Sequence, residues 1–183
     1  MPDGVKIVSP VFVRQCEIGR GLFAGRHFAA GEEILRFSGV LISLADVLAK
    51  GDEQSNALQV GDTSYIDIGA PGVFGNHSCE PNAGIRNDRV LIALRPIQHG
   101  EEIRYDYSTT MWEGIWTMPC MCGSAQCRRV VRDFPELPAE VQAEYLRLRV
   151  VQRFIVRRLR GGAFPNTPVV ARRELCSAIG AHQ

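Results

Sequence analysis

Lysine is almost missing from this chain. Only Lys6 and Lys50 occur among its 183 residues, so arginine carries nearly all of the positive charge. The formal net charge of +1 gives no case for a protein that binds nucleic acid over its whole surface. Arginine is concentrated between positions 128 and 160, where the simplest interpretation is the solvated basic face of a helix. A patch that attracts acidic partners or nucleic acid is the alternative there.

Long apolar runs are also missing. No stretch approaches the ~20 apolar residues that a membrane-spanning helix needs, so no membrane partner is expected. Residues 1–6 lack the charged head and apolar core of a signal peptide, which makes a cytoplasmic protein the default. Six cysteines in such a protein are not naturally paired as disulfides.

A complete nucleotide-binding fingerprint is absent as well. Gly19-Arg20-Gly21 is not followed by a third glycine at the required place, and no helical pattern follows it. The stretch from Leu22 to Phe28 looks extended instead. A phosphate cradle is therefore not expected. The glycines would let the backbone approach a ligand closely, and a plain hairpin turn is the alternative.

Short strand-like stretches, separated by turn residues, are what the chain does contain. A helix is expected over 41–48 with Ser43 as its N-cap, and a second helix from Pro138 to Gly161-Gly162, where apolar residues recur at helical steps. The chain is thus predicted to be mainly β with short helices. The expected strands cover residues 5–14, 22–28, 34–37, 57–60, 64–68, 83–87 and 90–94.

Two polar motifs interrupt this apolar pattern. The first is Asn76-His77-Ser78-Cys79-Glu80-Pro81-Asn82, and the second is Gly100-Glu101-Glu102-Ile103-Arg104-Tyr105-Asp106-Tyr107. Polar groups this dense are costly to bury unless each finds a partner. Taken singly, each motif is equally compatible with a well-bonded loop and with a functional site.

The cysteines near the tail suggest a metal. Cys120, Cys122 and Cys127 follow the spacing Cys-x-Cys-x4-Cys, which supplies three thiolates, one fewer than the tetrahedral set of a structural zinc. Cys16 and Cys176 have no partners at ligand spacing, so core or surface thiols are expected there. His27 and His99 are interpreted as hydrogen-bonded or exposed side chains.

In this order, the two polar motifs and the cysteine motif resemble those of the SET-domain protein lysine methyltransferases, over roughly residues 5–132. The resemblance implies a SET domain at 5–108 with small sheets and a C-terminal strand threaded through a loop. It also implies a post-SET zinc segment at 116–132. The residue pattern itself predicts a basic helix at 138–160 and a loose tail at 161–183 after it. The segment from Asp133 to Leu159 resembles the tail of small stand-alone bacterial members. The short spacing between Gly19 and Asn76 leaves room for only a small peptide-binding insert, so the substrate need not be a histone.

The resemblance also implies roles for individual residues. Cys79 is the expected fourth zinc ligand, with Cys120, Cys122 and Cys127. S-adenosylmethionine is the expected cofactor and a lysine amine of a protein or peptide the methyl acceptor. Tyr107 is the implied catalytic tyrosine, and Tyr105 limits the product, mainly to monomethyl-lysine. The cofactor-binding residues implied are Gly19, Arg20, Gly21, Phe23, Asn76, His77 and Tyr107.

Alternatives stay open at several positions. Tyr65 fits either the lysine channel or the core, while Trp112, Trp116 and Phe134 fit either a cover over the cofactor or channel, or hydrophobic staples. For the whole chain, the rivals are a catalytically weak SET-fold scaffold that binds a partner through its arginine-rich helix, and a methyltransferase for a small molecule. Nucleic acid is expected only at that helix.

Overall fold

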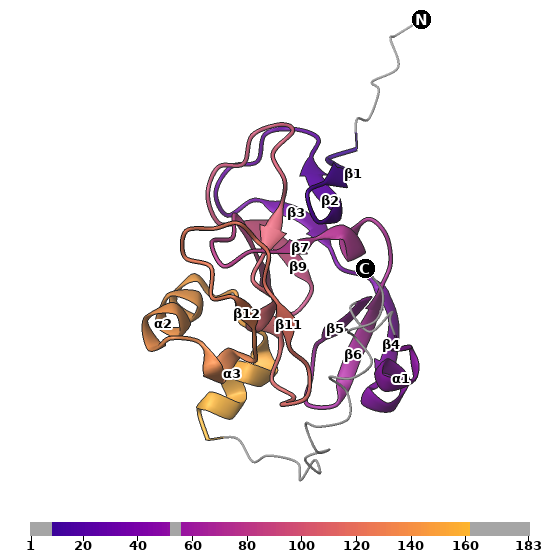
Figure 1. Ribbon diagram of the computed structural model, residues 1–183, viewed down its shortest axis with the longest axis vertical. Coiled ribbons are helices and arrows are strands. Elements are labelled where there is room, and N and C mark those ends of the chain that lie inside the picture. Colours follow the sequence, from indigo (N-terminus) through magenta and orange to yellow (C-terminus); the bar gives the residue numbers. More distant parts are fainter. Residues whose placement is uncertain (1–8, 52–55, 162–183) are drawn as a thin grey trace, which may run out of the picture.

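The computed structural model describes residues 9–51 and 56–161. Within this part of the chain the strands form small sheets of two or three strands, as expected for a mainly β protein. Figure 1 shows two C-terminal helices on one side of the molecule, and a three-stranded sheet with one short helix on the other. The predicted loose tail at 161–183 lies outside the described residues from position 162 onward. No helix in the described ranges is long and apolar enough to cross a membrane.

The first two strands form a hairpin. Strand β1 (Val11–Cys16) pairs antiparallel with β2 (Gly19–Ala24), and Gly19, with φ of +108°, closes the turn between them. The predicted strand at 5–14 was wrong in its limits, because β1 begins after Pro10 and continues to Cys16. Proline cannot donate a ladder hydrogen bond, so it stands before the strand. Residues 5–8 lie outside the described ranges.

A three-stranded antiparallel sheet forms the centre of the fold. Strand β9 (Val90–Ala93) lies between β3 (Glu33–Arg36) and β8 (Ala83–Arg86). The turn between β8 and β9 places two non-glycine residues at positive φ, Asn87 at 52° and Asp88 at 66°. Asn and Asp tolerate this conformation, and such a turn matches the twist of a hairpin. The strands predicted here are confirmed, with ends shifted by a residue or so.

The second three-stranded sheet has the order β4–β6–β5, from β4 (Gly39–Ser43), β6 (Ser64–Ile68) and β5 (Ala57–Gln59). Helix α1 (Leu44–Ala49) follows β4 directly. Ser43 and Asp46 form a capping box at its start, which confirms Ser43 as the N-cap. The predicted helix start at Leu41 was wrong, because residues 41–43 pair with β6.

A short parallel pair joins the two polar motifs. Strand β7 (Asn76–His77) follows the 3-10 turn η2 (Gly72–Phe74) and pairs with β10 (Arg104–Tyr105). Residue Arg104 lies opposite Asn76, and Tyr105 opposite His77. The 3-10 turn η3 (Tyr107–Thr110) follows β10 at once. Segments distant in sequence therefore meet at one place in the fold.

The segment after the SET-like region, residues 118–159, begins with a hairpin and ends with two helices. Strands β11 (Met118–Pro119) and β12 (Val130–Val131) flank the tail cysteines, and the turn η4 (Phe134–Glu136) leads to the helices α2 (Ala139–Leu148) and α3 (Arg153–Leu159). Figure 1 shows α2 and α3 beside the central sheet, and side chains of both helices pack against β9.

The single helix predicted for 138–160 was wrong. Arg149 adopts the left-handed conformation with φ of 58° and ends α2, and α3 begins after Gln152. Val150 is buried against Gly84 of the central sheet, where an added Cβ would lie only 2.8 Å from the valine. The Asp88 carboxylate then accepts the backbone N–H of Arg153 at 2.8 Å. The packing of Val150 and the hydrogen bond to the Arg153 N–H favour two helices over one continuous helix.

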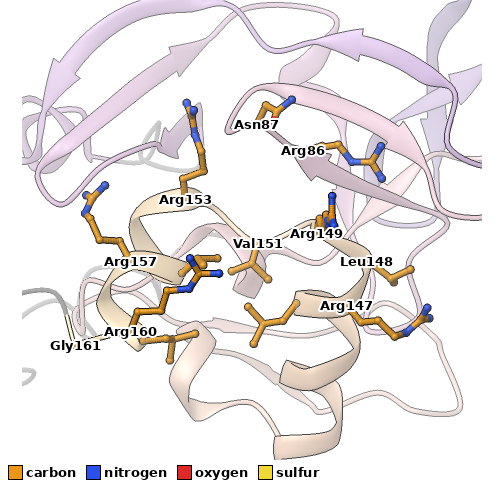
Figure 2. Close-up of a pocket in the computed structure, with 13 residues that line it drawn as sticks. Arg86, Asn87, Arg147, Leu148, Arg149, Val151, Arg153, Arg157, Arg160 and Gly161 are labelled. Atoms are coloured by element: carbon orange, nitrogen blue, oxygen red, sulfur yellow. The ribbon is translucent and has the colours of Figure 1, made fainter.

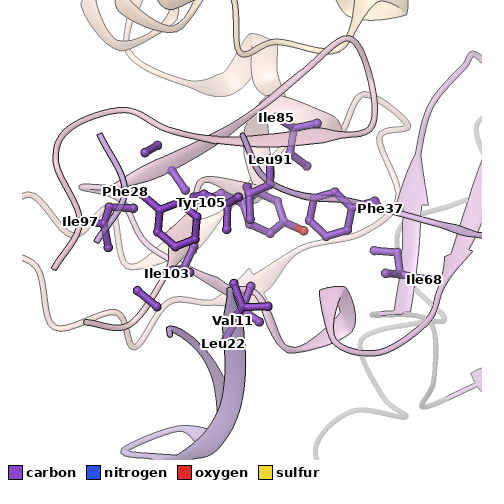
Figure 3. Close-up of a cluster of buried hydrophobic side chains, with 14 of the residues drawn as sticks. Val11, Leu22, Phe28, Phe37, Ile68, Ile85, Leu91, Ile97, Ile103 and Tyr105 are labelled. Atoms are coloured by element: carbon purple, nitrogen blue, oxygen red, sulfur yellow. The ribbon is translucent and has the colours of Figure 1, made fainter. Parts of the chain in front are cut away.

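Two apolar clusters hold these layers together. The larger one lies between the hairpin and the central sheet and includes Phe28, Phe37 and Tyr105 (Figure 3). The second packs the underside of α2 and α3 against β9, with Phe134 and Phe154 fully buried. Strand β9 contributes to both clusters, Leu91 and Ala93 to the first and Val90 and Ile92 to the second.

Candidate active site and metal centre

Tyr107 is held from both ends. Its backbone N–H donates to Nδ1 of His77 at 3.2 Å, and its hydroxyl donates to the Gly75 carbonyl at 2.9 Å. Its ring packs against Tyr105, with ring centroids 4.9 Å apart, and against the edge of His77 at 5.4 Å. Burial raises the pKa of Tyr107, so the hydroxyl stays protonated. While the Tyr107 hydroxyl donates its proton to the Gly75 carbonyl, the hydroxyl oxygen can still accept a hydrogen bond.

His77 is uncharged and contacts both Tyr107 and Cys79. Burial lowers its pKa to about 4, which outweighs the nearby carboxylate of Asp106. Because Nδ1 accepts the Tyr107 N–H, the imidazole proton lies on Nε2, which is 3.4 Å from the sulfur of Cys79. His77 therefore links the tyrosine to the first cysteine of the metal cluster.

Asp106 connects the second polar motif to the tail. One of its oxygens accepts the backbone N–H of Ser108 at 3.0 Å. The other accepts an Arg128 N–H at 2.6 Å and the Tyr145 hydroxyl at 2.8 Å. A buried carboxylate must have such partners, since an uncompensated charge would be very costly. The residue between the two tyrosines is therefore tied to both the cysteine segment and α2.

Tyr105 forms a wall beside Tyr107. It is 6% exposed and packs against Phe37, with ring centroids 5.8 Å apart (Figure 3). Burial keeps its pKa well above the ordinary value, so its hydroxyl is neutral. No group among residues 9–51 and 56–161 forms a hydrogen bond with that hydroxyl. Its hydrogen-bonding capacity is therefore unused within the described residues.

The Gly-x-Gly strand meets the first motif at Asn76. The Asn76 side-chain amide donates to the Arg20 carbonyl at 3.1 Å and to the Glu102 carboxylate at 2.9 Å. A Cβ on Gly21 would lie 2.5 Å from a Glu102 carboxylate oxygen, so a side chain there would displace that carboxylate. Strand β2, Asn76 and the second polar motif are thus in contact at one place, the corner around Asn76.

The predicted cofactor residues divide into two groups. Arg20, Gly21, Asn76, His77 and Tyr107 are brought together around this corner by the contacts above, and the Arg20 guanidinium also lies over the Phe74 ring at 4.3 Å. Gly19 lies at the β1–β2 turn with φ of +108°. The Phe23 side chain is buried, stacks on Phe12 at 5.8 Å and lies under Arg14, so it packs within the hairpin.

The four predicted zinc ligands meet. The sulfurs of Cys79, Cys120, Cys122 and Cys127 all lie within 4.8 Å of one another. A zinc ion with Zn–S bonds of about 2.3 Å requires four sulfurs at this spacing. Burial disfavours the Cys122 thiolate, but backbone hydrogen bonds from Cys79 and Ser124 outweigh it and lower the pKa of Cys122 to about 6. The donor set fits a structural zinc.

Backbone amides support the cluster from outside. The Arg128 N–H donates to the Cys79 sulfur and the Arg129 N–H to the Cys127 sulfur, each at 3.4 Å. The Arg104 guanidinium also donates to the Cys122 carbonyl at 3.1 Å. Such contacts orient the ligands of a metal site. Strand β10 therefore contacts both the candidate active site and the cysteine segment.

The structure shows how the aromatic residues with two possible roles are packed. Phe134 is fully buried in the cluster beneath α2 and α3, and Trp112 packs partly against that cluster. Trp116 packs against the cysteine cluster. Tyr65 is 2% exposed and donates a hydrogen bond to the carboxylate of Glu113.

Several supporting residues were missed in the sequence. Asp106 and Glu102 lie inside the quoted motifs, and their positions among apolar residues were the signal that they need partners. Arg128 directly follows the last ligand cysteine, but Tyr145 gave no local signal, because it looked like an ordinary apolar position of a helix. Only the fold brings these last two to Asp106.

Comparison with known proteins agrees with this geometry. Residues 19–108 match the family model described as "SET domain". The chain is 35% identical over 127 residues to "Histone-lysine N-methyltransferase 2B" of Homo sapiens, which covers 61% of this chain and 5% of that protein. It is 38% identical over 129 residues to "Histone-lysine N-methyltransferase ash1" of Drosophila melanogaster, covering 62% of this chain and 6% of the relative.

A fungal relative gives the same result. "Histone-lysine N-methyltransferase, H3 lysine-4 specific" of Emericella nidulans is 32% identical over 135 residues, which is 64% of this chain and 11% of that protein. The chain therefore spans only a small part of these relatives. The similarity to small stand-alone bacterial members stays a prediction. Residues 19–108 of this chain form a SET domain, which is homologous to those of the histone-lysine N-methyltransferases and is followed by a four-cysteine cluster.

Proposed function

We propose that this chain transfers a methyl group from S-adenosylmethionine to the side-chain amine of a lysine in a protein. The observation that carries the proposal is the position of Tyr107, whose hydroxyl is fixed on the Gly75 carbonyl beside Asn76 and His77. This arrangement presents a neutral, oriented oxygen between an aromatic wall and the corner that the cofactor would use. Orientation of this kind is a main source of rate enhancement.

The corner around Asn76 suits the cofactor. Asn76 uses its amide nitrogen for Arg20 and Glu102, and within the described residues its side-chain oxygen has no partner. That oxygen can accept from an ammonium or amino group of the ligand. Arg20, Gly21 and His77 would complete the binding site with backbone groups. S-adenosylmethionine, when bound, supplies the activated methyl carbon, so the protein need only orient and desolvate the amine.

The lysine must lose its proton before transfer, since an ammonium has no lone pair and its pKa in water is ~10.4. An aromatic wall of Tyr105, Tyr107 and Phe37 disfavours the charged form by desolvation. His77 is not a base for this step, because its Nδ1 already accepts the Tyr107 N–H. The Tyr107 oxygen can accept a hydrogen bond from the neutral amine and hold its lone pair toward the methyl group.

We also propose that the product is mainly monomethyl-lysine. The free hydroxyl of Tyr105 can hydrogen-bond the amine or a water beside it. A methylated amine would have to rotate against that bond, and against the crowded ring, before a second transfer. A phenylalanine at this position would lack the bond and leave room.

The four-cysteine cluster is proposed to bind one Zn²⁺. The metal would fasten the segment after Met111 to the SET domain through Cys79 and contribute to folding of the tail. Support comes from the sulfur spacing and from the amides that donate to two of the sulfurs.

Incubation of the purified full chain with S-adenosylmethionine labelled in its methyl group tests the proposal, with histone H3 and a whole-cell lysate as separate acceptors. A labelled protein band whose modified residue is lysine by mass spectrometry is expected. Label in a small molecule would replace the protein substrate with another acceptor. No transfer, together with cofactor binding by calorimetry, would favour the scaffold alternative.

A further inference from the structure

A large hollow lies between the two C-terminal helices and the β8–β9 hairpin, and the proposed reaction does not use it (Figure 2). It encloses about 1550 Å³ and is lined from Arg86 and Asn87 through α2 and α3 to Gly161. Typical small-molecule sites hold ~300–1000 Å³. The size therefore suits a segment of polypeptide better than a metabolite.

The hollow is strongly basic. Within the described residues no aspartate or glutamate lines it. The arginine side chains gather around its rim in Figure 2. They are Arg86, Arg147, Arg149, Arg153, Arg157 and Arg160.

Only half of these arginines are neutralised by the protein. Three form ion pairs at the edge of the hollow, namely Arg147 with Glu144, Arg153 with Asp88, and Arg157 with Asp62. In the described part of the chain, no carboxylate lies within 4.0 Å of the guanidinium of Arg86, Arg149 or Arg160. The Nε of Arg86 is moreover buried without a hydrogen-bond partner. An unpaired, partly buried cation is stabilised by an anion that approaches it.

The floor of the hollow is apolar. It is formed by aliphatic side chains from both helices, and two of them are unusually exposed, Leu146 at 36% and Leu159 at 42%. Phosphate-backbone binding needs cations and gains little from such a floor. A peptide helix with leucines on one face and carboxylates beside them would match both features. The remaining floor residues are Leu148, Val151 and Val156.

We propose that this arginine-rimmed groove docks an acidic amphipathic segment of a partner protein, in the helix-in-groove manner. Charge complementarity selects this occupant. Residues 162–183 of the chain itself contain Arg172 and Arg173 against Glu174, so they carry no excess of acid. A second copy of the groove would bring like charges together, which disfavours self-association.

Fluorescence anisotropy with the full chain at physiological salt tests the proposal. The probe is a labelled synthetic peptide of glutamate, alanine and leucine, with its leucines on one helical face. Binding is expected, and a peptide of identical composition with leucines spread around the helix should bind at least about fivefold more weakly, since apolar burial contributes most of that difference.

Three variants localise the binding. Arg160→Glu should weaken it about tenfold and Leu159→Ser about threefold, as loss of one charge contact and one apolar contact predicts. Arg26→Glu makes the same charge change at a half-exposed side chain outside the groove and should bind as the wild type does. Equal weakening by Arg26→Glu would mean a general charge effect and would overturn the docking site.

Other occupants give other results, and each overturns the proposal. A short DNA duplex that displaces the probe, with binding reduced by Arg160→Glu but unchanged by Leu159→Ser, would assign the groove to nucleic acid. Displacement by a synthetic peptide of residues 162–183 would assign it to this chain's own segment. Dimers by light scattering that dissociate in Leu159→Ser would assign it to a second copy. No binding of the acidic probe would remove the site altogether. None of these readouts depends on methyl transfer.

Discussion

Tyr145 on α2 donates a hydrogen bond of 2.8 Å to Asp106, the residue between the two site tyrosines. Asp106 is 1% exposed and also pairs with Arg128, so a helix outside the SET domain completes the partners of a buried charge within it. The C-terminal helices are therefore part of the support of the candidate active site.

Replacing Tyr145 with phenylalanine should destabilise the protein. The change keeps the ring but removes one hydrogen bond to an ionised acceptor, which typically contributes ~1.5–3 kcal/mol. Urea unfolding of the wild type and the variant measures the loss. Gln142→Ala in the same helix removes hydrogen bonds to backbone carbonyls at the partly exposed start of α2 and is the matched comparison. A Tyr145→Phe protein as stable as the wild type would show that Arg128 alone satisfies Asp106.

Replacing Cys122 with serine should release the metal. A hydroxyl is a far poorer zinc ligand than a thiolate, and three remaining cysteines leave the tetrahedral set incomplete. Elemental analysis should find one zinc per wild-type chain and much less in Cys122→Ser, whereas Cys16→Ser should keep the full amount. Chelator treatment of the wild type should lower its melting temperature. Wild-type protein purified without chelator that contains no zinc would contradict the assignment.

Replacing Tyr105 with phenylalanine should raise the degree of methylation. The variant keeps the packing against Phe37 but lacks the hydroxyl that holds the amine. Mass spectrometry of the product after extended reaction should show mainly monomethyl-lysine for the wild type, with di- or trimethyl-lysine appearing in the variant. Efficient trimethylation by the wild type would disprove the product limit.

Glu113 should make stability depend on pH. Burial raises its pKa to about 7, while the Tyr65 hydrogen bond opposes the rise. The folded state therefore binds the proton more tightly than the unfolded chain, whose pKa lies near 4.3. Proton binding by Glu113 therefore contributes to the free energy of unfolding. The contribution is fully present below about pH 4.3 and is lost as the pH rises toward about 7.

Glu113→Gln isolates this effect, because the amide keeps a hydrogen bond to Tyr65 without titrating. The difference in unfolding free energy between wild type and variant should change by on the order of 1–3 kcal/mol across that window, with the wild type losing more as pH rises. Urea unfolding at several pH values measures it. A difference that stays flat with pH would mean that Glu113 has an ordinary pKa.

The sequence predicted the four-cysteine cluster better than the limits of the elements around it. Cysteine spacing is a local signal, and with the family resemblance it located all four cysteines, while the roles of Asn76 and Tyr107 stay predictions. The break between α2 and α3 left no such signal, because apolar residues continue at helical steps through Leu148, Val151 and Ile155. The packing of Val150 on Gly84 favours the break between the helices, and that contact exists only in the folded protein.

The same reasoning explains the errors at the ends of elements. Leu41 fits a helical pattern, but pairing of β4 with β6 extends the strand to Ser43. Long-range pairing and packing override local preference at such positions.

The most direct test of the account is the rate of methyl transfer by Tyr107→Phe. The ring and its packing stay, while the hydroxyl fixed on Gly75 is lost. Loss of one preorganised polar group typically lowers the rate by ~10²-fold or more. With circular dichroism, zinc content and cofactor affinity close to those of the wild type, kcat measured with labelled S-adenosylmethionine should fall by that factor. A folded, cofactor-binding variant with an unchanged kcat would remove Tyr107 from the reaction.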